Sequence, residues 1–492
     1  MAPMIRVFRQ NVLNALNGSV IVVFAMVAAM APVALVAQAP DRSRPPTPGA
    51  PPALKLPPIE KRTLSNGLNV WVAEMHKTPV VNFMMVVKSG GAADPSGKFG
   101  LASFTAAMLD EGAGNRSSLE LADAIEFLGA SIETSSSFDA STVTLHTLTS
   151  KLDQAMPLFA DVVLRPTFPQ AEIDRIRKER LTTLLQMRDN AGQLASAVFA
   201  RTVFGRTHRY GTPMIGTETV NSQITGADLT SFYSAQYTPA NSTLIVTGDV
   251  TAAAIVPRLE QVFGAWRGAA PSRPALTPAT APSAREVVLV DKPGAAQTQL
   301  RIGTIGAARS TPDYFSIDVL NTILGGSFAS RLNQNLREEH GYTYGASSTF
   351  DMRGTPGPFL AGAGVQTDKT AESLTEFFKE LNNIHAPIGG DELARARNLE
   401  ALSFPGSFET TAAMASQLAE LVVYGLPESF LTDYVPRMQA VSAADLGRVA
   451  QQYIPTPRLV VIAVGDASKI EGPIRAGNFG PIRKMTADEV LK

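Results

Sequence analysis

Helix gives way to strand within one stretch of the chain, Leu324-Gly-Gly-Ser-Phe-Ala-Ser-Arg-Leu-Asn-Gln-Asn-Leu-Arg-Glu-Glu-His-Gly-Tyr-Thr-Tyr-Gly345. Leu332 and Leu336 are about one helical turn apart, so they can share a buried stripe. Gly341 is typical of the residue just past a helix C-terminus, because a positive φ costs glycine nothing. The stretch therefore predicts a helix that turns directly into a strand.

Side chains alternate along a strand, and here one face of the strand would carry Tyr342, Tyr344, Ala346 and Ser348. A helix joined so closely to this strand could present Arg337 and Tyr344 together. Arg337 offers a permanent charge with several donors, and Tyr344 offers a phenol donor. Two such donors suit a carbonyl oxygen that gains negative charge. The alternative is ordinary: a solvated arginine near a helix end and a packed tyrosine.

Composition excludes several classes of function. The chain has 492 residues, of which 45% are hydrophobic, enough for two or more domains with large cores. A net charge of −1 gives no electrostatic case for binding nucleic acid. The chain has no cysteine, which rules out thiol catalysis, disulfide bridges and cysteine-type zinc sites.

The N-terminal region has the pattern of an export signal. Val20–Val36 is strongly apolar, and Ala37-Gln38-Ala39 resembles a small-residue cleavage site. Because Pro40 disfavours a cut after Ala39, cleavage after Ala37 and retention as a membrane anchor both stay open. We expect residues 1–39 to be a signal peptide or an anchor. The rest of the chain should be exported, and the absence of cysteine fits a bacterial periplasm.

Two halves of the chain resemble each other. Ser135-Ser-Ser-Phe-Asp139 recurs as Ser347-Ser-Thr-Phe-Asp351, and Tyr237-Thr-Pro239 recurs as Tyr453-Ile-Pro455. The offsets of 212 and 216 residues are nearly equal. We interpret the chain as two copies of one α+β domain, each an α/β sandwich with a mixed sheet and helices.

Proline-rich segments indicate the domain boundaries. Residues 40–58 predict a stiff, exposed tether, and residues 268–285, rich in alanine, proline and serine, predict the linker between the domains. The domains would then be residues 59–267 and 286–492. In the first half we expect strands within 63–72, 80–87, 131–148 and 242–248, and helices at 101–111, 119–128, 151–164, 170–187, 217–237 and 251–263.

These motifs give the chain a resemblance to a known family, the pitrilysin or insulinase-like zinc peptidases, and most closely to the small two-domain type that includes mitochondrial processing peptidase. The resemblance spans roughly residues 63–467. Its most specific pieces are Gly100-Leu-Ala-Ser-Phe104 with Met108 and Gly112, His208-Arg-Tyr-Gly211 with Gly216, Phe232-Tyr233 with Tyr237, Pro239 and Asn241, and Leu324-Gly-Gly with Ser330-Arg-Leu332 and Leu336-Arg-Glu.

In that family a helix with the pattern H-x-x-E-H binds zinc, and a later glutamate completes the metal site. The resemblance puts Ser103 and Ala107 at the histidine positions, Ala106 at the general base and Gln186 at the later glutamate. Alanine has no ligand atom, a serine hydroxyl is a poor zinc ligand, and glutamine is neutral. The resemblance thus implies that this chain holds no metal and does not hydrolyse peptides alone.

Nearby residues do not replace the missing ligands. We expect Asp110 and Glu111 to form a solvated helix end. No two of the five histidines have i, i+4 spacing, and each is expected at the surface or in the core; they are His76, His146, His208, His340 and His385.

The second half retains what the first half lacks. In the family, an arginine and a tyrosine seven residues apart hold the substrate and stabilise its oxyanion at the zinc site. Arg337 and Tyr344 match that spacing, and the neighbouring Tyr342 does not.

Three hypotheses follow. In the first, the chain is the zinc-free subunit of a heterodimeric metallopeptidase that cleaves unfolded peptides, with zinc and H-x-x-E-H in a homologous partner. In the second, it is an inert scaffold or peptide-binding pseudopeptidase. In the third, it is a membrane-tethered assembly factor, which requires that the N-terminal segment be retained. Homodimers in the absence of the partner also stay open.

Overall fold

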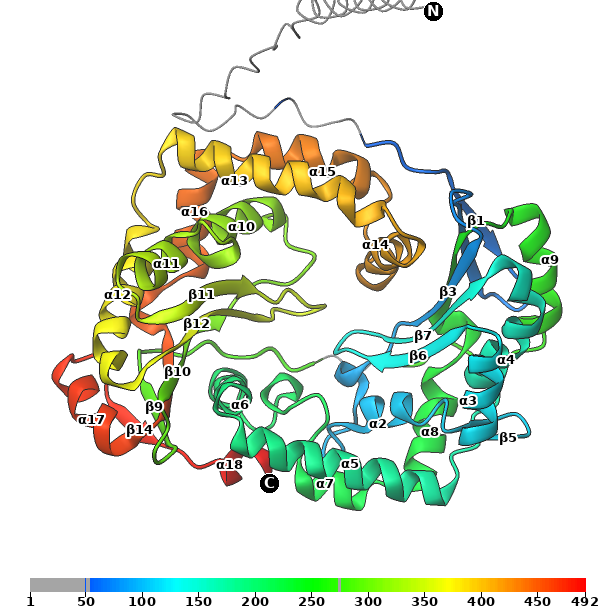
Figure 1. The fold of residues 1–492 in the computed structure, drawn as a ribbon, viewed down its shortest axis with the longest axis horizontal. Coiled ribbons are helices and arrows are strands. Elements are labelled where there is room, and N and C mark those ends of the chain that lie inside the picture. Colours follow the sequence, from blue (N-terminus) through cyan, green and yellow to red (C-terminus); the bar gives the residue numbers. More distant parts are fainter. Residues whose placement is uncertain (1–48, 50–53, 273–275) are drawn as a thin grey trace, which may run out of the picture. The chain divides into compact units, whose positions relative to one another are not determined.

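Val80–Val87 is central to the first sheet, as its apolar run predicts. In the computed structural model, which describes residues 49, 54–272 and 276–492, this strand (β3) pairs antiparallel with both of its neighbours. The strand order is β1-β2-β8-β3-β7-β6, and Figure 1 shows β3, β7 and β6 side by side. The other strands are β1 (Ile59–Thr63), β2 (Asn69–Glu74), β6 (Ser131–Ser136), β7 (Ser141–Leu148) and β8 (Ser242–Gly248).

The second sheet repeats this arrangement in the second half of the chain. Its order is β11-β12-β10-β13-β9-β14. Its strands are β9 (Val287–Asp291), β10 (Gln297–Ile305), β11 (Thr343–Phe350), β12 (Pro358–Gln366), β13 (Val460–Gly465) and β14 (Ile482–Lys484). In both sheets a parallel pair, β2 with β8 or β9 with β13, adjoins three antiparallel strands.

The two sheets differ at one edge. β1 precedes β2 through a tight turn and pairs with it antiparallel, whereas β14 comes from the end of the chain and pairs parallel with β9. The predicted duplication is therefore present in five of the six strands of each sheet.

Helices cover the sheets. In the first half they are α2 (Leu101–Ala107), α3 (Ser118–Phe127), α4 (Leu152–Leu164), α5 (Gln170–Asp189), α6 (Ala191–Phe204), α7 (Glu218–Gln223), α8 (Gly226–Gln236) and α9 (Ala252–Phe263), with a small hairpin of β4 (Gly112–Ala113) and β5 (Arg116–Ser117). In the second half they are α10 (Tyr314–Asn321), α11 (Arg331–Asn333), α12 (Thr370–Asn383), α13 (Gly390–Ser403), α14 (Thr411–Tyr424), α15 (Ser429–Ala440), α16 (Ala443–Tyr453), α17 (Ala467–Ala476) and α18 (Asp488–Leu491).

Four of the predicted helices match within two residues at each end, and two do not. The helix predicted at 101–111 ends at Ala107. The helix predicted at 217–237 is two helices, because a new helix begins after Thr225. The Thr225 side chain accepts a hydrogen bond from the backbone nitrogen of Asp228, and the Asp228 carboxylate accepts one from the backbone nitrogen of Thr225.

Each half lends a helix to the other half's sheet. α6 packs on β10 and β13, where Leu194, Val198 and Phe199 join Val460 and Ile462 in one buried cluster. Reciprocally, α14 packs on β3 and β8, and the Thr247 hydroxyl donates to the carbonyl of Thr411 at 2.7 Å. Separating the halves would therefore expose an apolar sheet face on each side.

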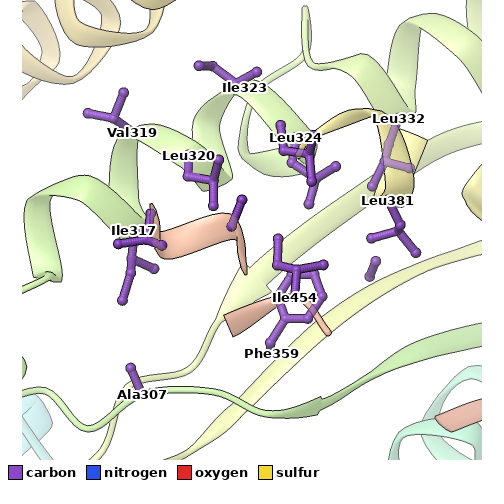
Figure 2. Packing of buried hydrophobic residues seen from close by; sticks show 14 of the residues in the cluster. Ala307, Ile317, Val319, Leu320, Ile323, Leu324, Leu332, Phe359, Leu381 and Ile454 are labelled. Atoms are coloured by element: carbon purple, nitrogen blue, oxygen red, sulfur yellow. The ribbon is translucent and has the colours of Figure 1, made fainter. Parts of the chain in front are cut away.

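The stretch from Leu324 onward is anchored in the core of the second half. Figure 2 shows Leu324 and Leu332 turned toward the same buried cluster as Leu381 and Ile454, and all four side chains are fully buried. After α10 the chain makes a π-helical turn, Thr322–Gly326, that lies against β11. A Cβ on Gly325 would meet the backbone nitrogen of Ser348 at 2.3 Å, so this approach requires glycine.

The predicted export segment, residues 1–39, lies outside the described residues, as does most of the predicted tether and the centre of the predicted linker. Among the helices of the described residues, none is both long and apolar enough to cross a membrane. The proposed domain boundaries stay predictions.

Candidate functional site

The glycine-rich loop before α2 is held by a buried ion pair. The Asp94 carboxylate accepts hydrogen bonds from the backbone nitrogens of Gly100 and Ala102, each at 2.7 Å, and so caps the helix. Arg209 donates to the same carboxylate at 2.7 Å, and both side chains are fully buried. The loop therefore fixes the first turn of α2 against the segment around Arg209.

A close backbone approach completes this junction. Gly100 has a φ of 113°, and a Cβ there would meet the carbonyl oxygen of Ile215 at 2.7 Å. Gly216 is equally crowded, because its Cβ would meet the carbonyl oxygen of Phe99 at 2.2 Å. The glycines that the sequence analysis singled out are thus required by packing at the start of α2.

Ser103 lies on α2 at the first position where the family pattern has histidine. Its hydroxyl donates to the carbonyl of Met214 at 2.8 Å and accepts from Nη2 of Arg180 at 2.9 Å. Arg180 is buried and also binds Asn221. The Ser103 oxygen is therefore part of a structural network.

The other three positions offer no better donors for a metal. Ala106 is buried and Ala107 half-buried on α2, and Gln186 is exposed on α5. In the described part of the chain, no group of three or more histidine, aspartate or glutamate residues is arranged to hold a metal ion. The donor set at the four positions therefore does not fit the zinc that the family pattern implies.

Asp110 and Glu111 do not form the solvated helix end that the sequence suggested. α2 has already ended, and burial raises the pKa of Asp110 to about 6. Glu111 accepts from Ser118 at 2.7 Å and forms an ion pair with Arg175 of α5. The prediction was wrong because the chain turns inward after Ala107 and packs these carboxylates against α5 and β6.

Three of the histidines lie in ordinary surroundings. His76 contacts Asp249 at 2.8 Å and Glu74 at 3.3 Å, and these hydrogen bonds raise its pKa. His208 accepts from the backbone nitrogen of Tyr210 at 3.1 Å, and His385 contacts the Ile454 carbonyl at 3.1 Å.

Arg337 lies in a second π-helical turn, Gln334–Glu339, just before β11. Its guanidinium lies 4.7 Å from the centre of the Phe328 ring, and its Nε lies 3.4 Å from the Glu338 carboxylate. The side chain is 39% exposed. Gly341 follows with a φ of 65°, as predicted.

Tyr344 projects outward, with 90% of its surface exposed. The predicted regular alternation is wrong, because Ala346 and Ser348 are buried and Tyr344 is not. The register against β12 shifts between Thr343 and Ala346. The Thr343 hydroxyl stabilises this bulge by bonding to the Gly364 carbonyl at 2.8 Å and accepting from the Gly345 nitrogen at 3.1 Å.

The structure brings Arg337 and Tyr344 onto consecutive elements without joining them. Among the described residues, no hydrogen bond, ion pair or ring contact links the two side chains. Both are available at the surface, and the bulge sets the direction of Tyr344.

Sequence reasoning missed α6, which borders a cavity of about 530 Å³ together with the loop after His208. The signals were present: the Asn190 side chain caps the helix by accepting from the Gln193 nitrogen, and Gly205 ends it with a φ of 80°.

Comparison with known proteins places these features in a family. The family model described as insulinase, peptidase family M16, matches residues 69–217, and the one described as the peptidase M16 inactive domain matches residues 223–400. The chain belongs to peptidase family M16. Its membership covers both halves, including the helix with Ser103 and the stretch with Arg337.

Relatives with similar sequences match most of the chain. An uncharacterized zinc protease of Mycobacterium leprae is 27% identical over 352 residues, which cover 68% of this chain and 75% of that protein. An uncharacterized zinc protease of Streptomyces coelicolor is 24% identical over a region that covers 80% of this chain and 87% of that protein.

Solved structures show the same two-domain fold. The peptidase M16 inactive domain from Pseudomonas fluorescens has a TM-score of 0.76 at 25% identity, covering 83% of this chain and 98% of its own. A protease from Helicobacter pylori has a TM-score of 0.78 at 23% identity, covering 83% and 100%.

Proposed function

We propose that this M16 chain is the zinc-free subunit of a heterodimeric metallopeptidase that hydrolyses unfolded peptides. One observation carries the proposal: the four metal-site positions lack suitable donors, while Arg337 and Tyr344 keep the family spacing and reach the surface. A homologous partner with an intact H-x-x-E-H helix would hold the zinc.

The retained pair has chemistry of its own to contribute. The Arg337 guanidinium is permanently charged and presents several N–H donors, and Tyr344 adds an O–H donor at an exposed position. Placed against a partner's site, these donors would bind the peptide and stabilise negative charge on the carbonyl oxygen under attack.

The experiment combines purified chain and partner and follows cleavage of an extended peptide. We expect Arg337→Ala or Tyr344→Phe to lower the rate of the mixture by ~10²–10³, the usual cost of removing an oxyanion donor. The matched controls are Tyr342→Phe, two residues from Tyr344, and Arg475→Ala, at an exposed position of α17. We expect both control variants to leave the rate of the mixture unchanged. Unchanged rates in the Arg337 and Tyr344 variants would refute the donor role.

The second candidate is an inert scaffold or peptide-binding pseudopeptidase. A chain of complex III from Candida albicans shares the fold with a TM-score of 0.71 at 14% identity, which is a likeness of fold alone. A scaffold has no need for an oxyanion clamp, so the retained pair favours the split enzyme.

Export to the periplasm is part of the proposal. N-terminal sequencing of the mature protein distinguishes a cleaved, periplasmic subunit from a membrane-tethered assembly factor. A start after Ala37 supports the first, and retention of residues 1–39 supports the second.

A further inference from the structure

The open cavity beside α6 is bordered by segments that lie far apart in the sequence. About 530 Å³ in volume, it lies among the α5–α6 corner, α6 and the loop at residues 210–214. Arg301 of β10 and Arg353, between β11 and β12, complete its wall. Among the described residues that line it there is no aspartate or glutamate.

Arg301 brings a positive charge to this wall without an anionic partner. Its Nη1 donates to the Leu300 carbonyl at 2.8 Å, and its other nitrogens lie 3.3 Å from the Gly192 carbonyl and the Ser196 hydroxyl. Among the described residues, no carboxylate lies within ion-pair distance of it. Desolvation lowers its pKa, as expected for a cation that lacks a counter-charge.

Arg353 adds a second guanidinium to the wall, but Asp351 balances its charge. Its Nε and Nη2 both donate to Asp351, at 3.0 and 2.5 Å, and its Nη1 is buried without a hydrogen-bond partner among the described residues. The guanidinium packs on the rings of Phe138 and Tyr210, at 4.1 and 4.4 Å from their centres. These contacts fix the guanidinium at the cavity.

The rest of the lining is largely apolar. Phe138, Met187, Pro213, Met214 and Ala197 face the cavity. A buried charge without a partner is costly, and apolar surface is favourably covered by apolar groups. The complementary ligand therefore combines one negative charge with an apolar body.

We propose that this cavity binds the C-terminal residue of a peptide, with its α-carboxylate at Arg301, beside the Arg353–Asp351 pair, and an apolar side chain against Phe138 and Met214. The inference rests on the proposed function, because it names the peptides that this subunit would capture. It assigns the cavity a role in binding that is separate from Arg337 and Tyr344.

The test uses the purified full-length chain without a partner. The probe is a pentapeptide that ends in phenylalanine and carries fluorescein at its amino end, prepared as the free acid and as the C-terminal amide. Fluorescence anisotropy should give a dissociation constant at least about tenfold lower for the acid, since the amide lacks the charge that the arginines recognise.

Variants locate the effect. Arg301→Gln should weaken binding of the acid at least about tenfold and bring it close to the amide, Arg301→Lys should retain part of the preference, and Arg475→Gln on α17 should bind as the unmodified chain does. Thermal unfolding checks that each variant is folded. Equal binding of acid and amide to the unmodified chain would overturn the proposal without any variant, as would undiminished binding by Arg301→Gln. A failure of the split-enzyme proposal is seen separately, as zinc in the isolated chain.

Discussion

At the scale of single residues, one of the four metal-site positions has a structural role of its own. Ser103 links α2 to α5 through Arg180, and it links α2 to the loop at residues 210–214 through the Met214 carbonyl. Reintroducing one histidine at residue 103 would break these bonds and still leave Ala107 and Gln186 without metal donors. A single substitution should therefore not create a zinc site, because three of the four positions would still lack suitable donors.

A buried carboxylate in the second half predicts a pH dependence. Burial and the nearby Glu400 raise the pKa of Asp318 to about 7, and Tyr434 donates to it at 3.1 Å. Because the unfolded pKa is about 3.9, the folded chain binds more protons between about pH 4 and about pH 7. The stability that protonated Asp318 contributes is thus complete below about pH 4 and is lost as pH rises through about 7.

Asp318→Asn should remove this dependence, because asparagine cannot ionise. Urea unfolding at about pH 5 and about pH 8 gives the free energy of unfolding at each pH. From the lower to the higher pH, this free energy should fall in the unmodified chain by up to about 3 kcal/mol more than it falls in the variant. Asp123→Asn, at an exposed position of α3, is the control. An Asp318→Asn profile parallel to that of the unmodified chain would contradict the assignment.

At the scale of elements, local patterns predicted what local contacts decide. The apolar run Val80–Val87 is a strand with the predicted bounds, and Gly341 has the predicted positive φ. The bulge at Thr343 was not predictable, because it depends on a hydrogen bond to Gly364 on the neighbouring strand. The resemblance supplied the candidate site residues, and tertiary packing decides the directions in which their side chains point.

The exchanged helix α6 gives a second prediction. Phe199 is buried, and a Cβ on Gly303 of β10 would meet its ring at 2.9 Å. Phe199→Ala should lower the free energy of unfolding by about 3–5 kcal/mol, the usual cost of emptying such a site. Leu185→Ala, on α5 and 56% exposed, should change it by less than about 0.5 kcal/mol.

Two spectroscopic probes of the unfolding of Phe199→Ala show whether the two halves of the chain unfold together or independently. Both tryptophans, Trp71 and Trp266, lie in the first half, whereas Phe199 packs on the second sheet. We expect the midpoints from tryptophan fluorescence and from far-ultraviolet circular dichroism to move together. A shift in circular dichroism with unchanged fluorescence would mean that the halves unfold independently.

At the scale of the whole molecule, the two halves have similar folds but carry different candidate site residues. The two halves share a sheet topology and exchange helices. Yet the helix of the first half has lost the family's metal donors, and the second half has kept an arginine and a tyrosine that reach the surface. Under the proposed function, such a chain would need another polypeptide to complete a hydrolytic site.

The metal content of the isolated chain tests this account most directly. The full-length chain is purified from a host that lacks the partner, dialysed against zinc and then against buffer, and assayed for bound zinc and peptide cleavage. We predict far less than one zinc per chain and no cleavage, with cleavage arising only when a subunit bearing H-x-x-E-H is added. One zinc per chain together with peptide cleavage by the chain alone would contradict the account.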